Sequence, residues 1–514
     1  MDMSVSVGAA AEPQPAKAEA RKAARGANAS DLDAWLEKVE KLGELKRITA
    51  EVDPDLEAAA ITYLVGSEKS PALLFENIKG HPGHRALYNM IGCNLSRFCL
   101  MIGEQPVDHP LKAVQILQQK LGRKMPPKEI PADQAICNQN VVEGDGIDIR
   151  IFPAQRMWPL DGGMYLGTGD AVVTKDPETG RINVGTYPMM IKGPREVGVY
   201  TSPGKDATID REKWWKMGKP MPIAAAYGID PLLFLVAATS LPKTECEYDY
   251  YSGINGAPIE VFTSDLTGLP LPARAEIVLE GFLYPDETFA EGPFGEFTGY
   301  YGRPSGATPF MRVERVRYRD NPTLTCALMA DGAANEAGLF WAALRSAGVW
   351  ADLQKLGVPG IKGRVVDPRG RGLGNHRGFH QADVCRPRST SDGARRAMHG
   401  RRLFRQVCDR RRRGYRSDQR QPGVMGHGDA LASGAVDRHP ARDLEHLPRS
   451  EPEPAGDQAL GIEMPDQCLH GLSLHQDFLQ AHQIVQRGLR QRGGEVAGAG
   501  IERNAPCDLR VRGG

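Results

Sequence analysis

The spacing of apolar residues predicts an amphipathic helix near the start of the chain. Apolar side chains recur at helical spacing over 32–42, Ser30 or Asp31 can cap the first turn, and Gly43 ends the pattern. The strand-like runs ELKRITAEV and PALLFENI follow, and then the amphipathic stretch HPLKAVQILQQKLG. Together these elements predict an N-terminal α/β domain over residues 31–130.

The pattern changes over residues 131–330, where short apolar runs are separated by Gly, Pro and Asp turns. AVVTK, PIAAAYG, PIEVFTS, AEIVLEGFL and TPFMRVERVRY are such runs. Their number and spacing predict a β-rich, split-barrel-like domain. EAGLFWAALRSAGVW then predicts a helix at the start of a C-terminal α/β domain, over 331–363. The predicted fold class is α+β.

Composition narrows the classes of protein to which the chain can belong. Residues 1–30 lack an apolar core and predict a disordered leader rather than a signal peptide. No apolar run approaches the length of a membrane span. Nine scattered cysteines without a CxxC pair indicate reduced, cytoplasmic thiols. Acidic and basic residues balance at 64 each, which gives no overall attraction for nucleic acid.

Two glutamates flank a turn in the stretch EGPFGEFTGYY. Glu291 and Glu296 lie on either side of Gly-Pro-Phe-Gly. A tight turn of this kind can aim carboxyl groups into a cavity as general acid and base. Surface glutamates beside an ordinary loop would give the same pattern, and spacing alone does not separate the two interpretations.

Three further stretches carry residues that suit a metal ion or a phosphate. Asn183 offers a neutral oxygen, the segment YTSPGKDA can cradle a phosphate and supply an acid, and ECEYDYY clusters three acids. Each stretch alone also fits a turn, a loop or a polar strand edge. The residues concerned are Asn183, Gly185, Ser202, Gly204, Lys205, Asp206, Glu245, Glu247 and Asp249.

The order and spacing of longer motifs over residues 31–363 resemble the UbiD family of 3-polyprenyl-4-hydroxybenzoate-type decarboxylases. The motifs are ALLFENIKG, NVGTY, VYTSPGKD, YGIDPLLFLVAATSLP, EYDYYSG, LTGLPLPARAEIVLEG and EGPFGEFTGYYG. The resemblance implies non-oxidative, reversible decarboxylation of an aromatic or α,β-unsaturated acid. It also implies prenylated FMN, Mn²⁺ or Mg²⁺, a possible K⁺ ion, a flavin prenyltransferase as cofactor supplier, and a homo-oligomer.

The resemblance assigns roles to individual residues. Glu291 and Glu296 correspond to the catalytic acid pair, with Glu296 as the proton donor to the substrate carbon. The metal ligands would be Asn183, Asp206 and Glu247. The cofactor-binding residues would be Asn183, Gly185, Thr186, Ser202, Gly204, Lys205 and Glu247.

Two positions depart from the family pattern. The catalytic arginine of the family falls on Pro188, and its metal-binding histidine falls on Asp206. Asp remains a competent ligand for Mn²⁺ or Mg²⁺, whereas Pro carries no charge. Either Arg195 or Lys192 assists instead, or the chain is a catalytically impaired, flavin-binding remnant.

The chain from residue 364 to 514 contains 26 Arg and no Lys. One interpretation is an unstructured, nucleic-acid-binding tail. The other is an out-of-frame translation, because codons can be chosen for 408–419 that read VIVVDEDIDP one base later. Residues 443–454 and the segment DPRGRGLGNHRGFHQADVCR also give family-like sequence in that frame. The second interpretation predicts that the C-terminal α/β domain is lost to a frameshift.

Overall fold

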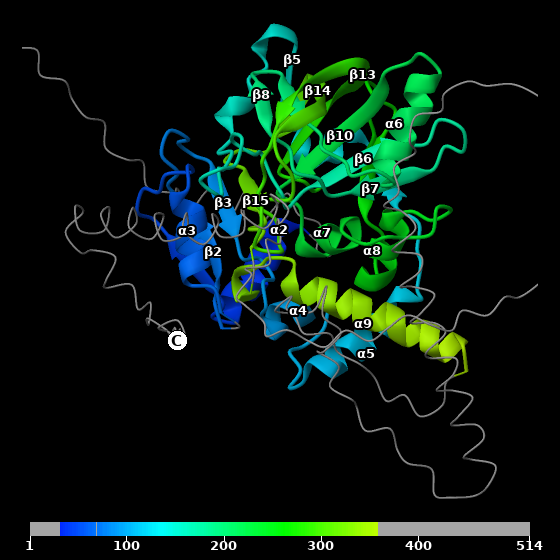
Figure 1. Ribbon diagram of the computed structural model, residues 1–514. Coiled ribbons are helices and arrows are strands. Elements are labelled where there is room, and N and C mark those ends of the chain that lie inside the picture. The colour runs from blue at the N-terminus through cyan, green and yellow to red at the C-terminus, as the bar shows by residue number, and fades with distance from the viewer. Residues whose placement is uncertain (1–30, 68, 331, 358–514) are drawn as a thin grey trace, which may run out of the picture. The chain divides into compact units, whose positions relative to one another are not determined.

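The computed structural model describes residues 31–357 except 68 and 331, and Figure 1 draws this part in colour. The predicted leader at 1–30 and the predicted out-of-frame tail at 364–514 lie outside the described residues. The same holds for the last residues of the segment 331–363.

The first helix begins and ends as its sequence predicts. Helix α2 (Leu32–Lys41) is capped by Asp31, whose Oδ1 accepts the N–H of Ala34 at 2.7 Å. Its apolar stripe is buried, including Trp35 and Val39. The aspartate satisfies a backbone donor that the first turn leaves without a helical partner.

A four-stranded sheet joins segments that are far apart in the sequence. Its order is β1 (Leu45–Ile48), β2 (Ala72–Phe75), β3 (Arg85–Tyr88) and β15 (Thr323–Cys326). Strand β15 pairs in parallel with β3, and Figure 1 shows the two strands next to each other. The end of the predicted β-rich segment therefore completes the N-terminal sheet. The domain boundaries themselves stay predictions.

A larger, eight-stranded sheet carries the segments with candidate chemistry. Its order is β7 (Ile182–Gly185), β6 (Ala171–Lys175), β10 (Met221–Tyr227), β13 (Ile277–Glu291), β14 (Gly306–Tyr318), β9 (Glu196–Gly198) and β8 (Ile191–Gly193), with β5 (Asn140–Glu143) also pairing β14. The order begins at β7 and ends at β8, so the strands of the described chain form no closed barrel. The β-rich prediction is confirmed, and the fold as a whole is mixed α/β.

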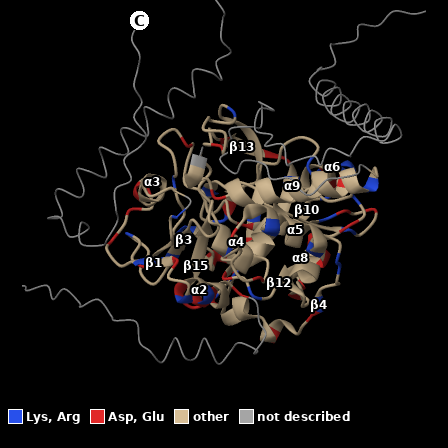
Figure 2. Cartoon of the chain, turned by 90° about the horizontal axis from the view of Figure 1, so that it is seen from below, with Lys and Arg blue, Asp and Glu red and all other residues tan. Residues whose placement is uncertain are grey.

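A third, three-stranded sheet and a set of helices complete the described chain. The sheet order is β12 (Pro270–Pro272), β11 (Glu260–Thr263) and β4 (Lys128–Glu129). The helices are α3 (Glu57–Leu64), α4 (Leu95–Met101), α5 (Pro110–Leu121), α6 (Asp206–Lys216), α7 (Pro231–Ala237), α8 (Glu247–Asn255) and α9 (Gly338–Lys355). Helix α9 packs against α5, and Figure 2 shows α4, α5 and α9 mostly in tan, with few charged residues.

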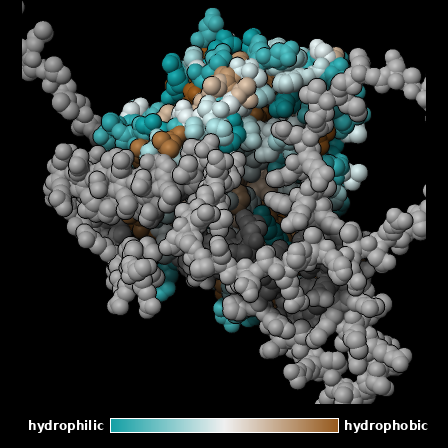
Figure 3. Space-filling view, in the orientation of Figure 1, coloured by the Kyte–Doolittle hydropathy of each residue, from teal (hydrophilic) through white to brown (hydrophobic). Residues whose placement is uncertain are grey.

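The central strand β10 explains why the large sheet has an apolar interior. All of its residues are buried, and Ala224–Ala226 pair with β6 on one side and β13 on the other. A continuous apolar run is typical of a strand covered on both faces. By contrast, the described residues at the top of Figure 3, near β5 and β8, are mostly hydrophilic.

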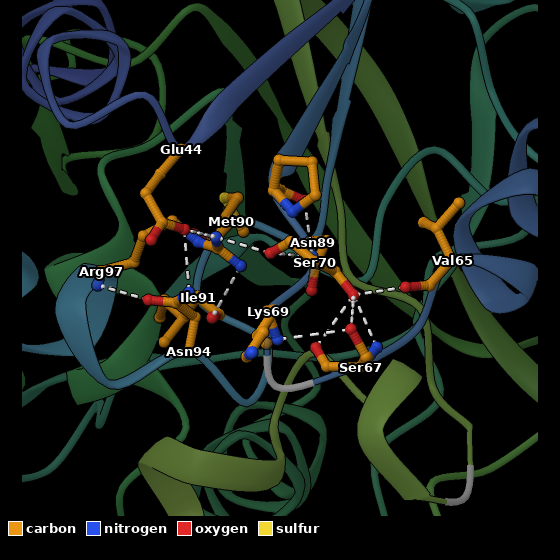
Figure 4. A network of polar contacts seen from close by, with 12 residues as sticks. Glu44, Val65, Ser67, Lys69, Ser70, Asn89, Met90, Ile91, Asn94 and Arg97 are labelled. Carbon is orange, nitrogen blue, oxygen red and sulfur yellow. Dashed lines mark hydrogen bonds and ion pairs between the residues drawn. The ribbon is translucent and has the colours of Figure 1, made fainter. Parts of the chain in front are cut away.

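A buried polar network fixes the loops between the N-terminal strands and helix α4 (Figure 4). Arg97 is 0% exposed, and its guanidinium donates to the carbonyl oxygen of Ser70 at 2.7 Å and to Glu44 at 2.8 Å. Glu336 accepts backbone N–H groups from residues 90–92 at 2.7–3.1 Å. These bonds tie the segment that follows β15 to the N-terminal sheet.

None of the helices within the described ranges combines the length and the apolar character that crossing a membrane requires.

Candidate active site

Strand β13 carries Glu291 into the interior at its last residue. The residue is 1% exposed, and its side chain faces three hydrogen-bond donors. Its Oε1 accepts the phenolic O–H of Tyr165 at 2.9 Å, and its Oε2 accepts the hydroxyl of Thr308 at 3.0 Å. The third donor is the guanidinium of Arg303, which forms an ion pair with Oε2. Glu291 is therefore a buried carboxylate rather than a surface residue of a loop.

Arg303 is a residue that sequence reasoning missed. Its guanidinium lies 3.9 Å from the ring centroid of Tyr200 and donates to Thr308 at 2.9 Å. The signal in the sequence was its place twelve residues after Glu291, on the far side of the same turn.

The two cations that the sequence suggested have other partners. Arg195 pairs with Glu314 at 3.3 Å, and Lys192 pairs with Glu196 at 3.5 Å. Among the described residues, the cation that forms an ion pair with Glu291 is Arg303 and neither of these. Arg195 and Lys192 therefore form ion pairs away from Glu291, and their assistance to the substrate stays a prediction.

Glu296 lies in a tight turn between Gly295 and Tyr301, which form a β-bridge. Its backbone N–H donates to the carbonyl oxygen of Tyr300 at 2.9 Å. A Cβ on Gly302 would lie 2.6 Å from Glu296 Cγ, so a side chain at position 302 would force Glu296 to shift. Burial raises the pKa of Glu296, while a backbone hydrogen bond from Phe297 opposes the rise. The two glutamates thus occupy different environments, one ion-paired and one half-buried.

Asp161 holds the turn in place from a different loop. Its Oδ1 accepts the N–H of Gly295 at 2.8 Å, and its Oδ2 accepts that of Trp158 at 2.9 Å. Burial raises the pKa of Asp161 to about 7, although these N–H donors favour the charged form. The backbones also touch, because a Cβ on Gly162 would lie 2.2 Å from the carbonyl oxygen of Gly292.

The predicted metal ligands form a second group. Glu247 opens helix α8 and is buried, and it accepts the N–H of Val184 at 2.8 Å. Asn183 precedes that residue on β7, and its amide group donates to Thr174 at 3.0 Å. Because an amide donates through nitrogen, the carbonyl oxygen of Asn183 keeps its acceptor function.

Arg181 and Lys243 join this second group, and sequence reasoning missed both. Arg181 Nη1 lies 3.0 Å from Asp206 Oδ2, and its Nη2 lies 3.7 Å from Glu247 Oε1. Lys243 forms an ion pair with Asp206. Arg181 therefore bridges the two predicted metal-binding carboxylates, and two side-chain cations balance two acids.

The loop before helix α6 provides space beside a helix N-terminus. Gly204 has a φ of +80°, and a Cβ there would meet no atom within 4 Å. Lys205 precedes the helix and makes no side-chain capping bond. Ser202 is exposed, and its carbonyl oxygen accepts the N–H of Lys205 at 3.2 Å. Backbone N–H groups at the start of a helix favour an anion such as a phosphate.

Thr186 and Gly185 lie at the end of β7. The hydroxyl of Thr186 donates to Asp170 Oδ1 at 2.8 Å, while Asp170 Oδ2 is buried without a hydrogen-bond partner among the described residues. Burial raises the pKa of Asp170 to about 7. A Cβ on Gly185 would lie 2.4 Å from the hydroxyl of Tyr187, so a side chain there would force Tyr187 to shift.

The residues present fit a hard divalent ion by donor type. Asn183, Asp206 and Glu247 all offer oxygen, which Mn²⁺ and Mg²⁺ prefer. Within the described ranges, no three His, Cys, Asp or Glu side chains cluster to hold a metal, so such a site needs the amide of Asn183. Arg181 Nη2 is buried without a hydrogen-bond partner in that part of the chain and lies 3.7 Å from Glu247 Oε1.

Two segments of the chain match known family domains. Residues 36–117 match the 3-octaprenyl-4-hydroxybenzoate carboxy-lyase N-terminal domain, and residues 128–331 match the Rift-related domain of the same enzyme family, UbiD. Together these segments span more than half of the chain.

Two curated proteins are similar to this chain in sequence, and one of them is named a decarboxylase. A phenolic acid decarboxylase from Streptomyces sp. (strain D7) is 36% identical over 302 residues, which cover 57% of this chain and 62% of that protein. An uncharacterized protein from Synechocystis sp. is 33% identical over 322 residues, with the same coverage of the two chains. The chain thus spans less than two thirds of the length of these relatives.

Solved structures share the fold. The vanillic acid decarboxylase of Sedimentibacter hydroxybenzoicus in its closed form is 29% identical, with a TM-score of 0.61 over 66% of this chain and 72% of that one. An evolved dimeric form of the UbiD-class enzyme HmfF from Pelotomaculum thermopropionicum, in complex with prenylated FMN, is 26% identical. Its TM-score is 0.61 over 72% of this chain and 82% of that one.

The close contact between Gly162 and Gly292 leaves no room for a side chain at position 162. We expect Gly162→Ala to push the turn at 292–295 away from Asp161, because the new Cβ has no room beside the carbonyl oxygen. Hydrogen exchange at the amide of Gly295 should become faster, and stability should fall by roughly 1–3 kcal/mol. Gly348→Ala is the control, since a Cβ there meets no atom within 4 Å. Unchanged exchange at Gly295 would show that the contact does not hold the turn.

Proposed function

Because the chain belongs to the UbiD family of carboxy-lyases, we propose that it is a prenylated-FMN-dependent decarboxylase. The proposed substrate is an aromatic or α,β-unsaturated carboxylic acid, and the reaction is reversible and non-oxidative. The observation that carries the proposal is the turn that holds Glu291 and Glu296 in different environments. Two neighbouring carboxyl groups in different surroundings are typical of acid–base pairs.

The proposed roles of the two glutamates follow from these environments. Decarboxylation breaks the bond between the substrate carbon and the carboxylate, CO₂ leaves, and the electron pair stays with the substrate carbon. Bound prenylated FMN supplies the electron sink for that pair. Glu296, whose pKa is raised by burial, holds a proton and donates it to the same carbon. Glu291, held by its ion pair with Arg303, is the proposed second member of the acid pair.

The second group of residues is proposed to hold the cofactor phosphate and its metal ion. Mn²⁺ or Mg²⁺ would bind the oxygens of Asn183, Asp206 and Glu247, and K⁺ is a further candidate ion. The phosphate would lie against the start of α6. There, the residues proposed to line it are Gly185, Thr186, Ser202, Gly204 and Lys205. The prenylated FMN in the HmfF relative supports the cofactor assignment.

The proposal includes the setting in which the enzyme works. A flavin prenyltransferase would supply the cofactor, and the chain would be a cytoplasmic homo-oligomer. The dimeric form of the HmfF relative supports self-association. Five described cysteines, among them Cys137 and Cys326, are free thiols, which supports a reducing compartment.

A second candidate function is a catalytically impaired, flavin-binding remnant. Pro188 stands where the family arginine is expected, and the family match ends at residue 331. The Lys-free segment from residue 364 supports an out-of-frame C-terminus. Arg303 argues against impairment, because it gives Glu291 a cation by another route.

The primary test is CO₂ release by the full chain reconstituted with prenylated FMN and Mn²⁺, using a panel of hydroxybenzoates. We expect release to depend on the cofactor and to fall by roughly 10²–10⁴-fold in Glu296→Gln, because the proton donor is lost. Glu314→Gln, which alters a glutamate paired with Arg195, should keep the wild-type rate. A wild-type chain that binds the cofactor but releases no CO₂ from any of these acids would favour the remnant.

The pH dependence follows from the raised pKa of Glu296. The donor is protonated below its pKa, so kcat should fall as pH rises through a value above 4.5, the ordinary pKa of a glutamate. A pH profile of kcat in the wild type and in Glu314→Gln should show the same alkaline limb. A limb at or below pH 4.5 would contradict the assignment of Glu296 as the acid.

The metal assignment predicts opposite effects for acids and cations of the second group. Asp206→Asn and Glu247→Gln should each weaken Mn²⁺ binding by at least roughly tenfold, and Arg181→Gln should strengthen it by removing a competing cation. Electron paramagnetic resonance of free Mn²⁺ measures both effects without activity. Asp249→Asn, in the same helix α8, is the control. Equal Mn²⁺ affinity in all four variants would exclude this ligand set.

The proposed frameshift predicts a specific sequencing result. The gene read across the codons for Gly360–Asp367 should contain one base more or fewer than this sequence implies. The corrected frame should then encode the segments that resemble the family. If the frame is confirmed as written, a sequencing error is excluded, the frameshift lies in the gene itself, and the remnant becomes the stronger candidate.

A further inference from the structure

The burial of Glu291 creates an electrostatic requirement. A carboxylate that is 1% exposed loses its hydration, and an unpaired buried charge costs several kcal/mol. Tyr165 and Thr308 supply hydrogen bonds to it but no opposite charge. Some cation must therefore balance Glu291 if it is to remain an ionised member of the acid pair.

Arg303 meets this requirement with a side chain that is itself held in place. Its Nη2 donates to both Glu291 and Thr308, and Thr308 in turn donates to Glu291, which closes a triangle of hydrogen bonds. The guanidinium also stacks over Tyr200. Its side chain is 21% exposed, so the aromatic ring and the hydroxyl, rather than full burial, fix its position.

The ion pair between Glu291 and Arg303 joins the two ends of the turn that carries Glu296. Glu291 ends β13, Arg303 precedes β14, and Glu296 lies in the turn between them. The ion pair therefore links the first and last residues of the segment 291–303, which carries the proposed proton donor. Asp161 holds the same segment at Gly295, from the side.

We propose that Arg303 is a positioning residue for the acid pair: it balances the charge of Glu291 and, by closing the base of the turn, fixes Glu296 toward the substrate. The catalytic part of this inference rests on the proposed decarboxylase function. The structural part, the dependence of Glu291 on Arg303, does not. Arg303 thus provides the cation that this chain lacks at position 188, from a different element of the fold.

A double-mutant cycle tests the structural part without any cofactor. Thermal unfolding is measured for the wild type, Arg303→Gln, Glu291→Gln and the double variant, all as full chains. Arg303→Gln alone should lower the unfolding midpoint by roughly 5–10 °C, because Glu291 is left buried without a cation. In the Glu291→Gln background, the same change should lower the unfolding midpoint by much less. An equal cost in both backgrounds would overturn the proposal.

Kinetics test the catalytic part with a matched control. Arg303→Gln should lower kcat by roughly 10²-fold with little change in KM, since a misplaced acid harms the chemical step rather than binding. Arg303→Lys should recover part of kcat by restoring the charge. Arg312→Gln is the control, because Arg312 also pairs with a glutamate, Glu287, and lies 4.9 Å from the ring centroid of Tyr284. It should leave kcat unchanged.

The outcomes separate the two levels of the proposal. A folded Arg303→Gln protein with wild-type kcat would overturn the positioning role. A wild-type chain that releases no CO₂ would defeat the proposed function, while the unfolding cycle would still decide whether Glu291 depends on Arg303.

Discussion

The pairing of strands β13 and β14 places each of three buried carboxylates next to an arginine that balances its charge. Glu276, just before β13, and Glu280 and Glu291, within it, are at most 1% exposed. Each meets an arginine on or beside the facing strand: Glu276 meets Arg319, Glu280 meets Arg317, and Glu291 meets Arg303. A shift in register would separate acids from bases inside the protein, where an uncompensated charge is costly. The three pairs therefore favour one alignment of the longest strands.

That alignment also decides where the candidate site lies. Two of the pairs lie near the end of the hairpin where β13 begins and β14 ends, and the third lies at its turn end, where the chain leaves β13 for the turn at Glu296. Asp161, from a separate loop, supplies a second restraint on this turn through the N–H of Gly295. The proposed proton donor is thus held by one ion pair at the base of its turn and by one buried carboxyl at its side.

In the proposed metal and phosphate site, ion pairs again balance the buried charges, but here the same carboxylates are also the proposed metal ligands. Asp206 and Glu247 face Arg181 and Lys243, so their charges are already compensated by the protein. A divalent ion that binds there must compete with a guanidinium that lies between its ligands. Loading of the metal and movement of Arg181 are therefore expected to be linked, since both cations attract the same oxygens.

The sequence alone determined the elements with strong periodicity and the motifs with many residues. The cap at Asp31, helix α9 and the apolar strand β10 follow from local patterns, and the turn around Glu291 and Glu296 was visible as a string of glycines, a proline and two acids. The longer motifs indicated the family. Local pattern could not place β15 beside β3, because that pairing joins distant segments.

Only the tertiary structure decided which cation serves which acid. The sequence suggested Arg195 and Lys192 and overlooked Arg303, and Arg181 showed no sign of standing between two predicted metal ligands. The physical reason is that an ion pair is set by strand register and burial, which bring side chains together over distances that no short-range pattern records.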